Sequence, residues 1–510
     1  MYQRGIEMKK RKNVLLITSD QQHWNTLGLF NPEVKTPNLD RLIKKGTVFS
    51  RAYCTNPTCT PSRASIITGK YPSQHGAYSL GTKLPEEEHT VGEDFLNAGY
   101  RTALIGKAHF QGLLDTEEYP SLESNPLMQD LDFWRNYKER FYGFEHIELA
   151  RNHVDEFHVG QHYGIWMEEK GFDWKPHFFK PGGTAENRQK HRWSIPEEFH
   201  YDTWIAERSC SMLEQYKNND ENFFLWSSFL DPHPGYLVPE PWDKMYDPEK
   251  ISLSSVVEGE HDKNPPHFKM TQEENPDFSI YEEPEGNSVH GGHSHLHDKK
   301  ELAKDIAVYY GMISLMDKYI GVILDKLEEL GLADDTLVVF TTDHGHFFGH
   351  HGLTAKGPFH YEDMIKIPYI ASMPGNIPEG TRSEALQTQA DMAPTFLSVC
   401  GIDIPRCMTG KDQKDVWFGK KDEARDHVIV ENRHQPTTMN HKTYVGKRYK
   451  LTVYYNQEYG ELFDLQEDPD EINNIWDSPE HKELKSGLLL KMMHAEMDKE
   501  PVLMPRIWGA

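Results

Sequence analysis

The chain has 510 residues, which is long enough for a large core and for more than one domain. Its 55 Lys and Arg against 80 Asp and Glu give a formal net charge of −25, which argues against nucleic acid and anionic membranes as partners. Five cysteines are too few for a disulfide framework, and the basic segment before Asn13 lacks an apolar signal-peptide core. We therefore expect a cytoplasmic globular protein, with a periplasmic or exported location left open.

Short apolar runs rich in β-branched residues alternate with helical patterns. Runs of this kind are typical of strands buried on both faces of a parallel sheet. The longest helical pattern extends from about Glu301 to Leu330 and has apolar residues at helical spacing. The alternation predicts an α/β fold with a mainly parallel sheet between helices. The four runs are Asn13–Thr18, Thr102–Ile105, Phe223–Phe229 and Thr336–Thr342.

The domain organisation follows from shifts in composition. Residues 1–425 are expected to form one catalytic α/β domain. Segments 113–196 and 244–300 are rich in Pro, Gly, His and aromatic residues and have weak periodicity, so we interpret them as loop insertions. From residue 426 to 510 short alternating runs predict a smaller C-terminal subdomain with an antiparallel sheet.

Polar residues follow each of the four apolar runs directly. Open α/β sheets bind ligands beyond the carboxyl ends of their strands, so these side chains are expected to meet at one edge of the sheet. Their types are those of metal ligands and of acids and bases. The pairs are Asp20 with Gln21, Lys107 with His109, Asp231 with His233, and Asp343 with His344.

Cys59 begins a segment with strong helix-start residues, Pro61 and Ser62. The cysteine is therefore expected at a helix N-terminus, where unpaired N–H groups favour negative charge. Arg63, one turn later, adds a fixed cation. Taken alone, Cys59 would more often be a buried structural cysteine.

The segment CTPSR followed by a Thr-Gly pair resembles the C-x-P-S-R signature of the formylglycine-dependent sulfatases. Other stretches resemble the family in the same order along most of the chain: TPNLDRL, GKAH, DPH, TTDHG and ELFDLQEDPDEINN. On these motifs the chain is identified as a member of the type I sulfatase family of the alkaline phosphatase superfamily. The resemblance implies an alkaline phosphatase-like fold and hydrolysis of sulfate esters.

The resemblance also implies one divalent metal. An oxygen-rich ligand set favours Ca²⁺. Two positions depart from the commonest family pattern, since Gln21 stands where a second Asp is frequent and His344 where Asn is frequent. Both substitutes can ligate, and they leave Mn²⁺ or another transition metal open. The implied ligands are Asp20, Gln21, Asp343, His344 and residue 59 itself, Cys59.

The nucleophile implied by the family is formylglycine made from Cys59 by a maturation enzyme. One hydroxyl of its hydrate attacks sulfur, and the second later expels sulfate, a step for which a plain cysteine has no group. Lysines and Arg63 stabilise the sulfate oxygens, one histidine protonates the leaving alcohol, and another acts as base in the last step. These roles fall on Lys107 and Lys356 as the sulfate-binding lysines, His233 as the acid and His109 as the base.

Several alternatives stay open. A sulfated sugar or polysaccharide fragment is the expected substrate, because long loops with aromatic residues suit a sugar, but aryl or choline sulfates are not excluded. The first rival activity is hydrolysis of phosphonate monoesters or phosphodiesters, which Gln21 and His344 favour. The second is a non-catalytic protein that binds sulfated polymers. The His-rich tract 287–298 is either a transition-metal site or an exposed loop.

Overall fold

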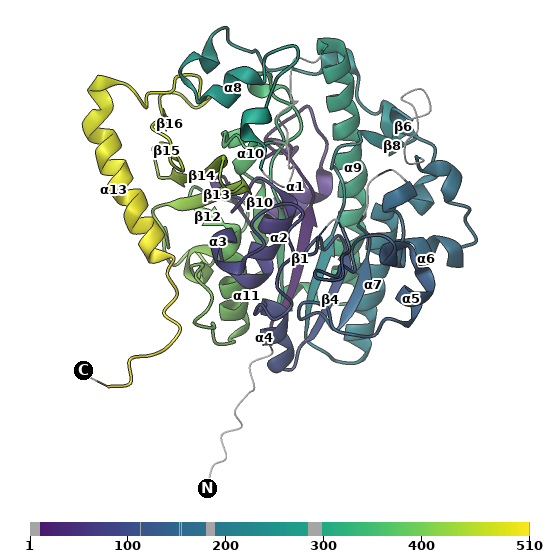
Figure 1. Cartoon of the computed structure of the whole chain (residues 1–510). Helices are drawn as coiled ribbons and strands as arrows, with labels where there is room; N and C mark the ends of the chain where they lie inside the picture. The colour runs from purple at the N-terminus through teal and green to yellow at the C-terminus, as the bar shows by residue number, and fades with distance from the viewer. Residues whose placement is uncertain are drawn as a thin grey trace.

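The computed structural model describes residues 11–112, 114–151, 154, 156–179, 189–283 and 298–508. A sheet lies at its centre (Figure 1). It has eight strands in the order β11-β2-β10-β9-β1-β7-β4-β5. Strands β9, β1, β7, β4 and β5 run parallel, whereas β10 is antiparallel to both of its neighbours. The strands are β1 Asn13–Ser19, β2 Thr47–Phe49, β4 Arg101–Gly106, β5 His146–Leu149, β7 Phe223–Ser228, β9 Thr336–Thr342, β10 Tyr369–Ser372 and β11 Thr381–Ser383.

Strand β1 shows why the apolar runs are continuous. Successive side chains of a strand point to opposite faces, so a strand covered on both sides needs apolar residues at every position. Val14 and Leu16 enter the core on one face of the sheet, and Leu15 and Ile17 enter the core on the other. All four are fully buried. The predicted α/β sheet between helices is confirmed.

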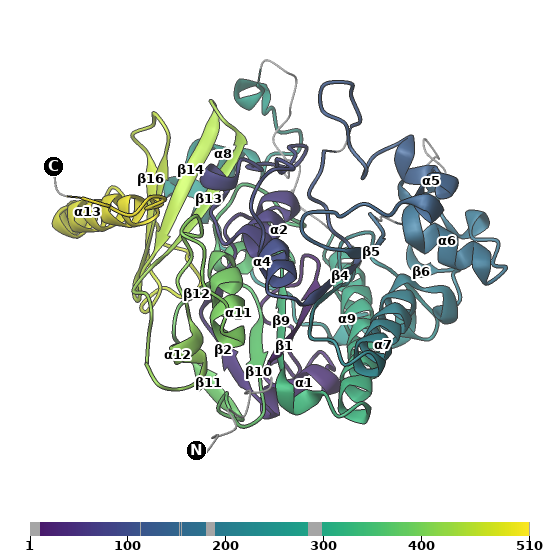
Figure 2. The same cartoon turned by 90° about the horizontal axis from the view of Figure 1, so that it is seen from below.

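The helices form one layer on each face of the sheet (Figure 2). On one face lie α2, α4 and α11; on the other lie α1, α7 and α9. Helix α9 is long and apolar enough to cross a membrane, but 83% of its most apolar window is buried inside the fold, as expected of a central helix. The bounds are α1 Pro37–Lys44, α2 Cys59–Thr68, α3 Pro72–His75, α4 Val91–Asn97, α7 Tyr201–Asn218, α9 Lys299–Glu329, α10 Glu362–Ile365, α11 Met392–Cys400 and α12 Lys414–Trp417.

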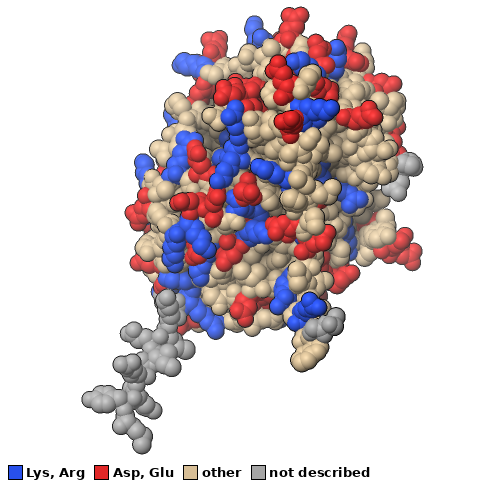
Figure 3. All heavy atoms as spheres, turned by 90° about the vertical axis from the view of Figure 1, so that its left-hand side faces the viewer, with Lys and Arg blue, Asp and Glu red and all other residues tan. Residues whose placement is uncertain are grey.

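A four-stranded antiparallel sheet lies near the C-terminus, as predicted, with helix α13 packed on it (Figure 1). Glu431 of this sheet joins it to the rest of the molecule, since its carboxylate accepts hydrogen bonds from the backbone and hydroxyl of Ser73 and from Lys499. On the face seen in Figure 3, acidic and basic side chains are interspersed. The elements are β13 Val428–Gln435, β14 Met439–Val445, β15 Tyr449–Tyr454, β16 Gly460–Asp464 and α13 Lys482–Asp498.

The segment 113–196 differs from the loop insertion expected from its composition. It contains β5, which pairs with β4 and completes the main sheet at one edge. The strand has only four residues and includes the polar His146 and Glu148, so it lacks the apolar run that marks the buried strands. The described helices and strands of the two segments and their surroundings are α5 Leu131–Asn136, α6 Gln161–Glu169, β6 His191–Trp193, β8 Leu237–Pro239 and α8 Pro266–Met270.

Candidate active site

The predicted site residues meet at the carboxyl edge of the central sheet. Asp20 and Gln21 follow β1 directly, and Asp343 and His344 follow β9, which is the neighbour of β1. Lys107 follows β4. The remaining residues come from α2, from the turn after β7 and from the loop after β9: Cys59 and Arg63, His233, and Lys356.

Cys59 is the first residue of α2, after an extended Thr58, and is 1% exposed. Its Sγ lies 3.2 Å from Lys356 Nζ, 3.9 Å from Lys107 Nζ and 3.4 Å from His344 Nε2. If the cysteine is oxidised to formylglycine, the hydrate oxygens would take the place of this sulfur. Two ammonium groups thus lie within 4 Å of the residue 59 sulfur at a helix N-terminus, an arrangement that favours negative charge there.

Arg63 is fully buried and is committed to the framework of the site. Its Nε donates to Asp343 Oδ2 at 3.0 Å and its Nη2 to Asp20 Oδ2 at 3.3 Å. Its Nη1 donates to the main-chain oxygen of Lys107 and to Ser228 Oγ. A planar guanidinium fork suits such fixed contacts. The structure therefore assigns Arg63 to holding the carboxylates, whereas the sequence pattern suggested a role on the sulfate oxygens.

A divalent metal fits the group formed by Asp20, Cys59, Asp343 and His344, whose ligand atoms all lie within 4.8 Å of one another. His344 Nδ1 faces the main-chain oxygen of Gly345 at 3.1 Å, which makes Nδ1 the donor and leaves the Nε2 lone pair free for an ion. Both polar atoms of the buried Gln21 amide lack a hydrogen-bond partner among the residues that the structure describes. An unsatisfied buried amide is costly, and a metal would satisfy its oxygen.

The buried carboxylates at this edge of the sheet lie next to positively charged side chains. Burial alone would raise the pKa of Asp20, but Lys107, His233 and Arg63 hold that pKa well below its usual range. Asp20 and Lys107 also form a direct ion pair. Burial raises the pKa of the Cys59 thiol despite the two lysines, so the unmodified residue is a protonated thiol and a poor nucleophile.

The position of His109 is fixed by a hydrogen bond of its backbone N–H and not by contacts of its imidazole ring. It has a φ of 57°, and its N–H donates to Glu123 Oε1 at 2.6 Å. Glu123 Oε2 accepts the next two backbone N–H groups, from Phe110 and Gln111. Both ring nitrogens of His109 are buried and have no hydrogen-bond partner in the described part of the chain. Burial, with Lys107 beside it, keeps the pKa of His109 well below its usual value, so the imidazole is a neutral base.

His233 lies on the solvent side of the nucleophile. Its Nδ1 is 2.9 Å from the main-chain oxygen of Pro234, and its Nε2 is 3.4 Å from Lys356 Nζ. Lys356 is 8% exposed and His233 is more accessible, whereas Asp20, Asp343 and His344 are fully buried. An ester entering from this side would meet Lys356 and His233 first, with its leaving group toward solvent.

Some residues of the site carry no motif that sequence reasoning used. Gln389 donates to the main-chain oxygens of Thr342 and Asp343, and Ser62 donates to the latter, so both fix the end of β9. Ser62 is the serine of the CTPSR segment, but neither its place in that segment nor its helix-start character gave it a role at the end of β9. Arg151, directly after the unpredicted strand β5, gave no signal at all. Most of the His-rich tract 287–298 lies outside the described residues.

Comparisons with known proteins identify the family of the chain. Residues 12–402 match the Sulfatase family, and residues 349–498 match the family described as N-sulphoglucosamine sulphohydrolase, C-terminal. An arylsulfatase of Clostridium perfringens is 29% identical, over 96% of this chain and 95% of that protein. An N-acetylglucosamine-6-O-sulfatase of Bacteroides thetaiotaomicron is 26% identical, over 95% of this chain and 86% of that protein.

A solved structure gives the same fold. The phosphonate monoester hydrolase of Silicibacter pomeroyi superposes with a TM-score of 0.78 at 23% identity, covering 97% of this chain and 96% of that one. At this identity the likeness concerns the fold, which is alkaline phosphatase-like. The match of the family over residues 12–402 shows that the chain belongs to the sulfatase family and is a sulfuric ester hydrolase.

Proposed function

We propose that the protein hydrolyses sulfate esters of sugars, with formylglycine at position 59 as nucleophile and one divalent metal held by Asp20, Gln21, Asp343 and His344. The observation that carries the proposal is the set of contacts around Cys59 Sγ, where two lysines and a metal-competent imidazole approach one helix N-terminus. The named sugar sulfatase among the relatives supports a sulfated sugar as substrate. Calcium is the preferred ion, because most of the donors are oxygens.

A formylglycine hydrate at position 59 would supply a nucleophilic and a second hydroxyl, and a metal held by Asp20, Gln21, Asp343 and His344 would polarise the sulfate oxygens. The chain's own residues do the remaining work. Lys356 and Lys107 bind the sulfate oxygens and stabilise the charge that grows there. Both ammonium groups already lie within 4 Å of the nucleophile position.

Two histidines divide the proton transfers. In its imidazolium form His233 gives the proton on Nε2 to the leaving oxygen and keeps the proton on Nδ1, whose contact with the oxygen of Pro234 orients the ring. His109, neutral because of its lowered pKa, takes a proton at one of its unpartnered ring nitrogens when sulfate is released. The two rings sit on different strand-end loops, so acid and base act at separate steps.

The experiment is turnover of 4-nitrophenyl sulfate by protein co-expressed with a formylglycine-generating enzyme. Activity should vanish after chelation and return with Ca²⁺ or Mn²⁺. The D343N variant is a second test, because it replaces a charged carboxylate of the metal site with a neutral amide of the same shape, and its activity should fall as well. Turnover that survives both chelation and D343N would refute the proposed metal site. A sugar panel with sulfate at different hydroxyls then identifies the substrate.

Hydrolysis of phosphonate monoesters is the second candidate. Gln21 and His344 are neutral ligands, so Asp20 and Asp343 are the two carboxylates facing the metal. Sulfate monoesters and phosphonate monoesters are both monoanions with a tetrahedral centre, and this charge balance accepts either. The ratio of kcat/KM for aryl sulfate and aryl phosphonate in one preparation distinguishes them. A ratio above one supports the sulfatase, and a ratio far below one makes the phosphonate ester the principal substrate.

A further inference from the structure

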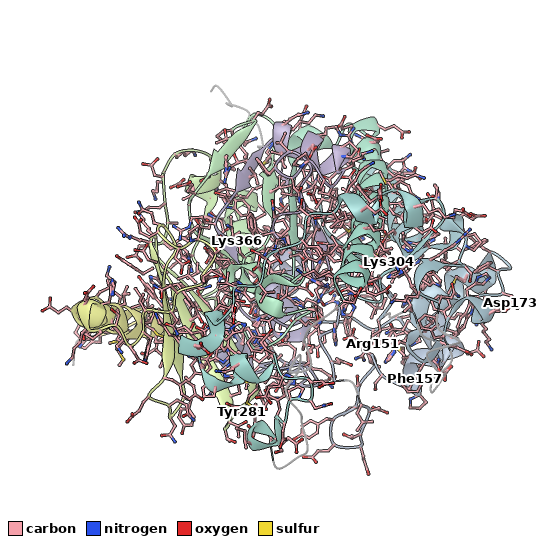
Figure 4. All side chains as sticks on the ribbon, turned by 90° about the horizontal axis from the view of Figure 1, so that it is seen from above. Arg151, Phe157, Asp173, Tyr281, Lys304 and Lys366 are labelled. Atoms are coloured by element: carbon pink, nitrogen blue, oxygen red, sulfur yellow. The ribbon has the colours of Figure 1, made fainter. Side chains whose placement is uncertain are left out.

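Arg151 is a buried cation that the reaction described above does not use. It follows β5 (His146–Leu149), whose last residue pairs with Gly106 at the end of β4. The backbone N–H of Ala150 donates to the oxygen of Gly106 at 3.0 Å. Since Lys107 comes next on β4, Arg151 leaves the sheet at the same edge as the catalytic residues. In Figure 4 it lies inward of Phe157 and Asp173, which mark the outer part of the same segment.

The positive charge of Arg151 acts electrostatically on residues of the proposed reaction centre. It interacts electrostatically with Cys59, and it is one of the cations that lower the pKa of His109. Arg151 is only 4% exposed to solvent. Arg151 therefore lies near the proposed nucleophile and base, on the β4–β5 side of the site. Lys356 reaches the same site from the loop after β9.

Unlike Arg63, Arg151 has few partners. Within the described part of the chain its guanidinium makes one hydrogen bond, from Nη1 to the main-chain oxygen of Glu123. The Glu123 carboxylate interacts with it only at longer range, and its oxygens already accept three backbone N–H groups. Among the described residues no ion pair within 4.0 Å includes Arg151.

Among the described residues the buried guanidinium of Arg151 faces one main-chain acceptor and no anion within ion-pair distance, and desolvation of a cation is costly unless an anion or several acceptors face it. Burial accordingly lowers the pKa of Arg151. The remaining donors of the fork match a carboxylate or a second sulfate, which planar guanidinium groups bind in pairs of hydrogen bonds. The scissile sulfate itself already has its proposed binding groups, which are Lys107, Lys356 and the metal held by its ligands.

We propose that Arg151 forms a subsite for a second anionic group, a carboxylate or sulfate carried by the substrate next to the scissile ester. This rests on the proposed sulfatase function and narrows its substrate class to esters with at least two negative charges close together. A neighbouring anion would complete the hydrogen bonds of the guanidinium, so the protein selects such substrates chiefly by binding.

The test compares two chromogenic esters, 4-nitrophenyl sulfate with an ortho carboxylate and the same ester with an ortho carboxamide. The enzymes are the wild type, Arg151→Met and Arg151→Lys. In Arg151→Met we expect KM for the carboxylate ester to rise about tenfold or more, the size of one charge-assisted hydrogen-bonded contact, with KM for the amide within about twofold. Arg151→Lys, which keeps the charge but not the fork, should lie between.

Arg135→Met is the matched control, since Arg135 lies on the same segment but is paired with Asp132 and Glu168 at the surface. It should change neither ester. Equal loss on both esters in Arg151→Met would place Arg151 on the scissile sulfate or in the framework and overturn the subsite, as would no change on either. Thermal unfolding of each variant separates misfolding from weak binding. A wild type that cleaves neither ester would overturn the proposed function as well, whereas the other outcomes leave it standing.

Discussion

The two sides of the catalytic edge handle charge differently. On the β1–β9 side Arg63 donates to both Asp20 and Asp343, and Lys107 from the end of β4 also pairs with Asp20, so both buried carboxylates have cationic partners. On the β4–β5 side Arg151 has one main-chain acceptor among the described residues. Fully partnered charges suit permanent parts of a site, whereas a charge with spare donors suits a group that comes and goes. The contrast separates framework from substrate recognition.

The largest effect is expected at the nucleophile, at the centre of the partnered side. Cys59→Ala removes the residue that carries the reacting group, so kcat/KM for 4-nitrophenyl sulfate should fall about a thousandfold or more. Cys407→Ala, which replaces a half-buried cysteine away from the site, is the control and should keep its activity. If Cys59→Ala retained a tenth of the activity, the nucleophile would have to be sought elsewhere.

Arg63→Met tests whether the partnered side is framework. It leaves two buried carboxylates without their shared cation, so the free energy of unfolding in the absence of metal should fall by about 3–5 kcal/mol. Chemical denaturation measures it. Arg63→Lys should recover only part of the loss, because an ammonium cannot reproduce the fork that spans Asp20 and Asp343. If the free energy of unfolding of Arg63→Met were unchanged, Arg63 would not be part of the framework, and its assignment to a different role from Arg151 would be wrong.

The same logic applies to Glu431, a buried carboxylate with several partners that is not one of the proposed catalytic or metal-binding residues. Burial would raise the pKa of this carboxyl, but Lys499 and Lys442 lower it to about 2. A lowered pKa gives stability that is complete above the unfolded value of about 4.3 and is lost as pH falls through 2, a contribution of about 3 kcal/mol. Glu431→Gln should remove this acid dependence between pH 5 and 2. A wild type and variant with parallel stability curves would contradict it.

The smallest effect is expected at Glu123, which connects the two sides by holding the backbone of His109. Glu123→Gln turns one acceptor oxygen into a donor that faces backbone N–H groups, so His109 should lose its orientation and kcat should fall about tenfold to a hundredfold. The alkaline and acid limbs of the pH profile should shift with it. Glu118→Gln, an exposed neighbour, is the control. A change in thermal stability alone, at constant kcat, would reduce Glu123 to a structural role.

The part of the fold and of the site that the sequence predicts also differs between the β1–β9 side and the β4–β5 side. Strands β1, β4, β7 and β9 are covered on both faces, so their apolar runs predicted them within a residue or two, and the side chains after them predicted the edge. The antiparallel C-terminal strands and the long helix α9 were likewise predictable from their patterns. The resemblance to sulfatases supplied the roles of the site residues, which no spacing alone would give.

The β5 side was not predictable for a physical reason. An edge strand of four residues needs no continuous apolar run, and here His146 and Glu148 interrupt it. Arg151 after it therefore looked like any surface arginine, and its burial depends on packing against distant segments. The commitment of Arg63 to Asp20 and Asp343 was also invisible, because it depends on how α2 faces the ends of two strands.

The most direct test of the account is peptide mass spectrometry of residue 59 in intact protein co-expressed with a formylglycine-generating enzyme, read together with sulfatase activity of the same sample. We expect the Cys59 peptide to carry the aldehyde or its hydrate and the activity to rise in proportion to the converted fraction. An unmodified thiol at Cys59, under conditions that convert a control sulfatase, would contradict the formylglycine mechanism. Activity independent of the converted fraction would contradict it equally.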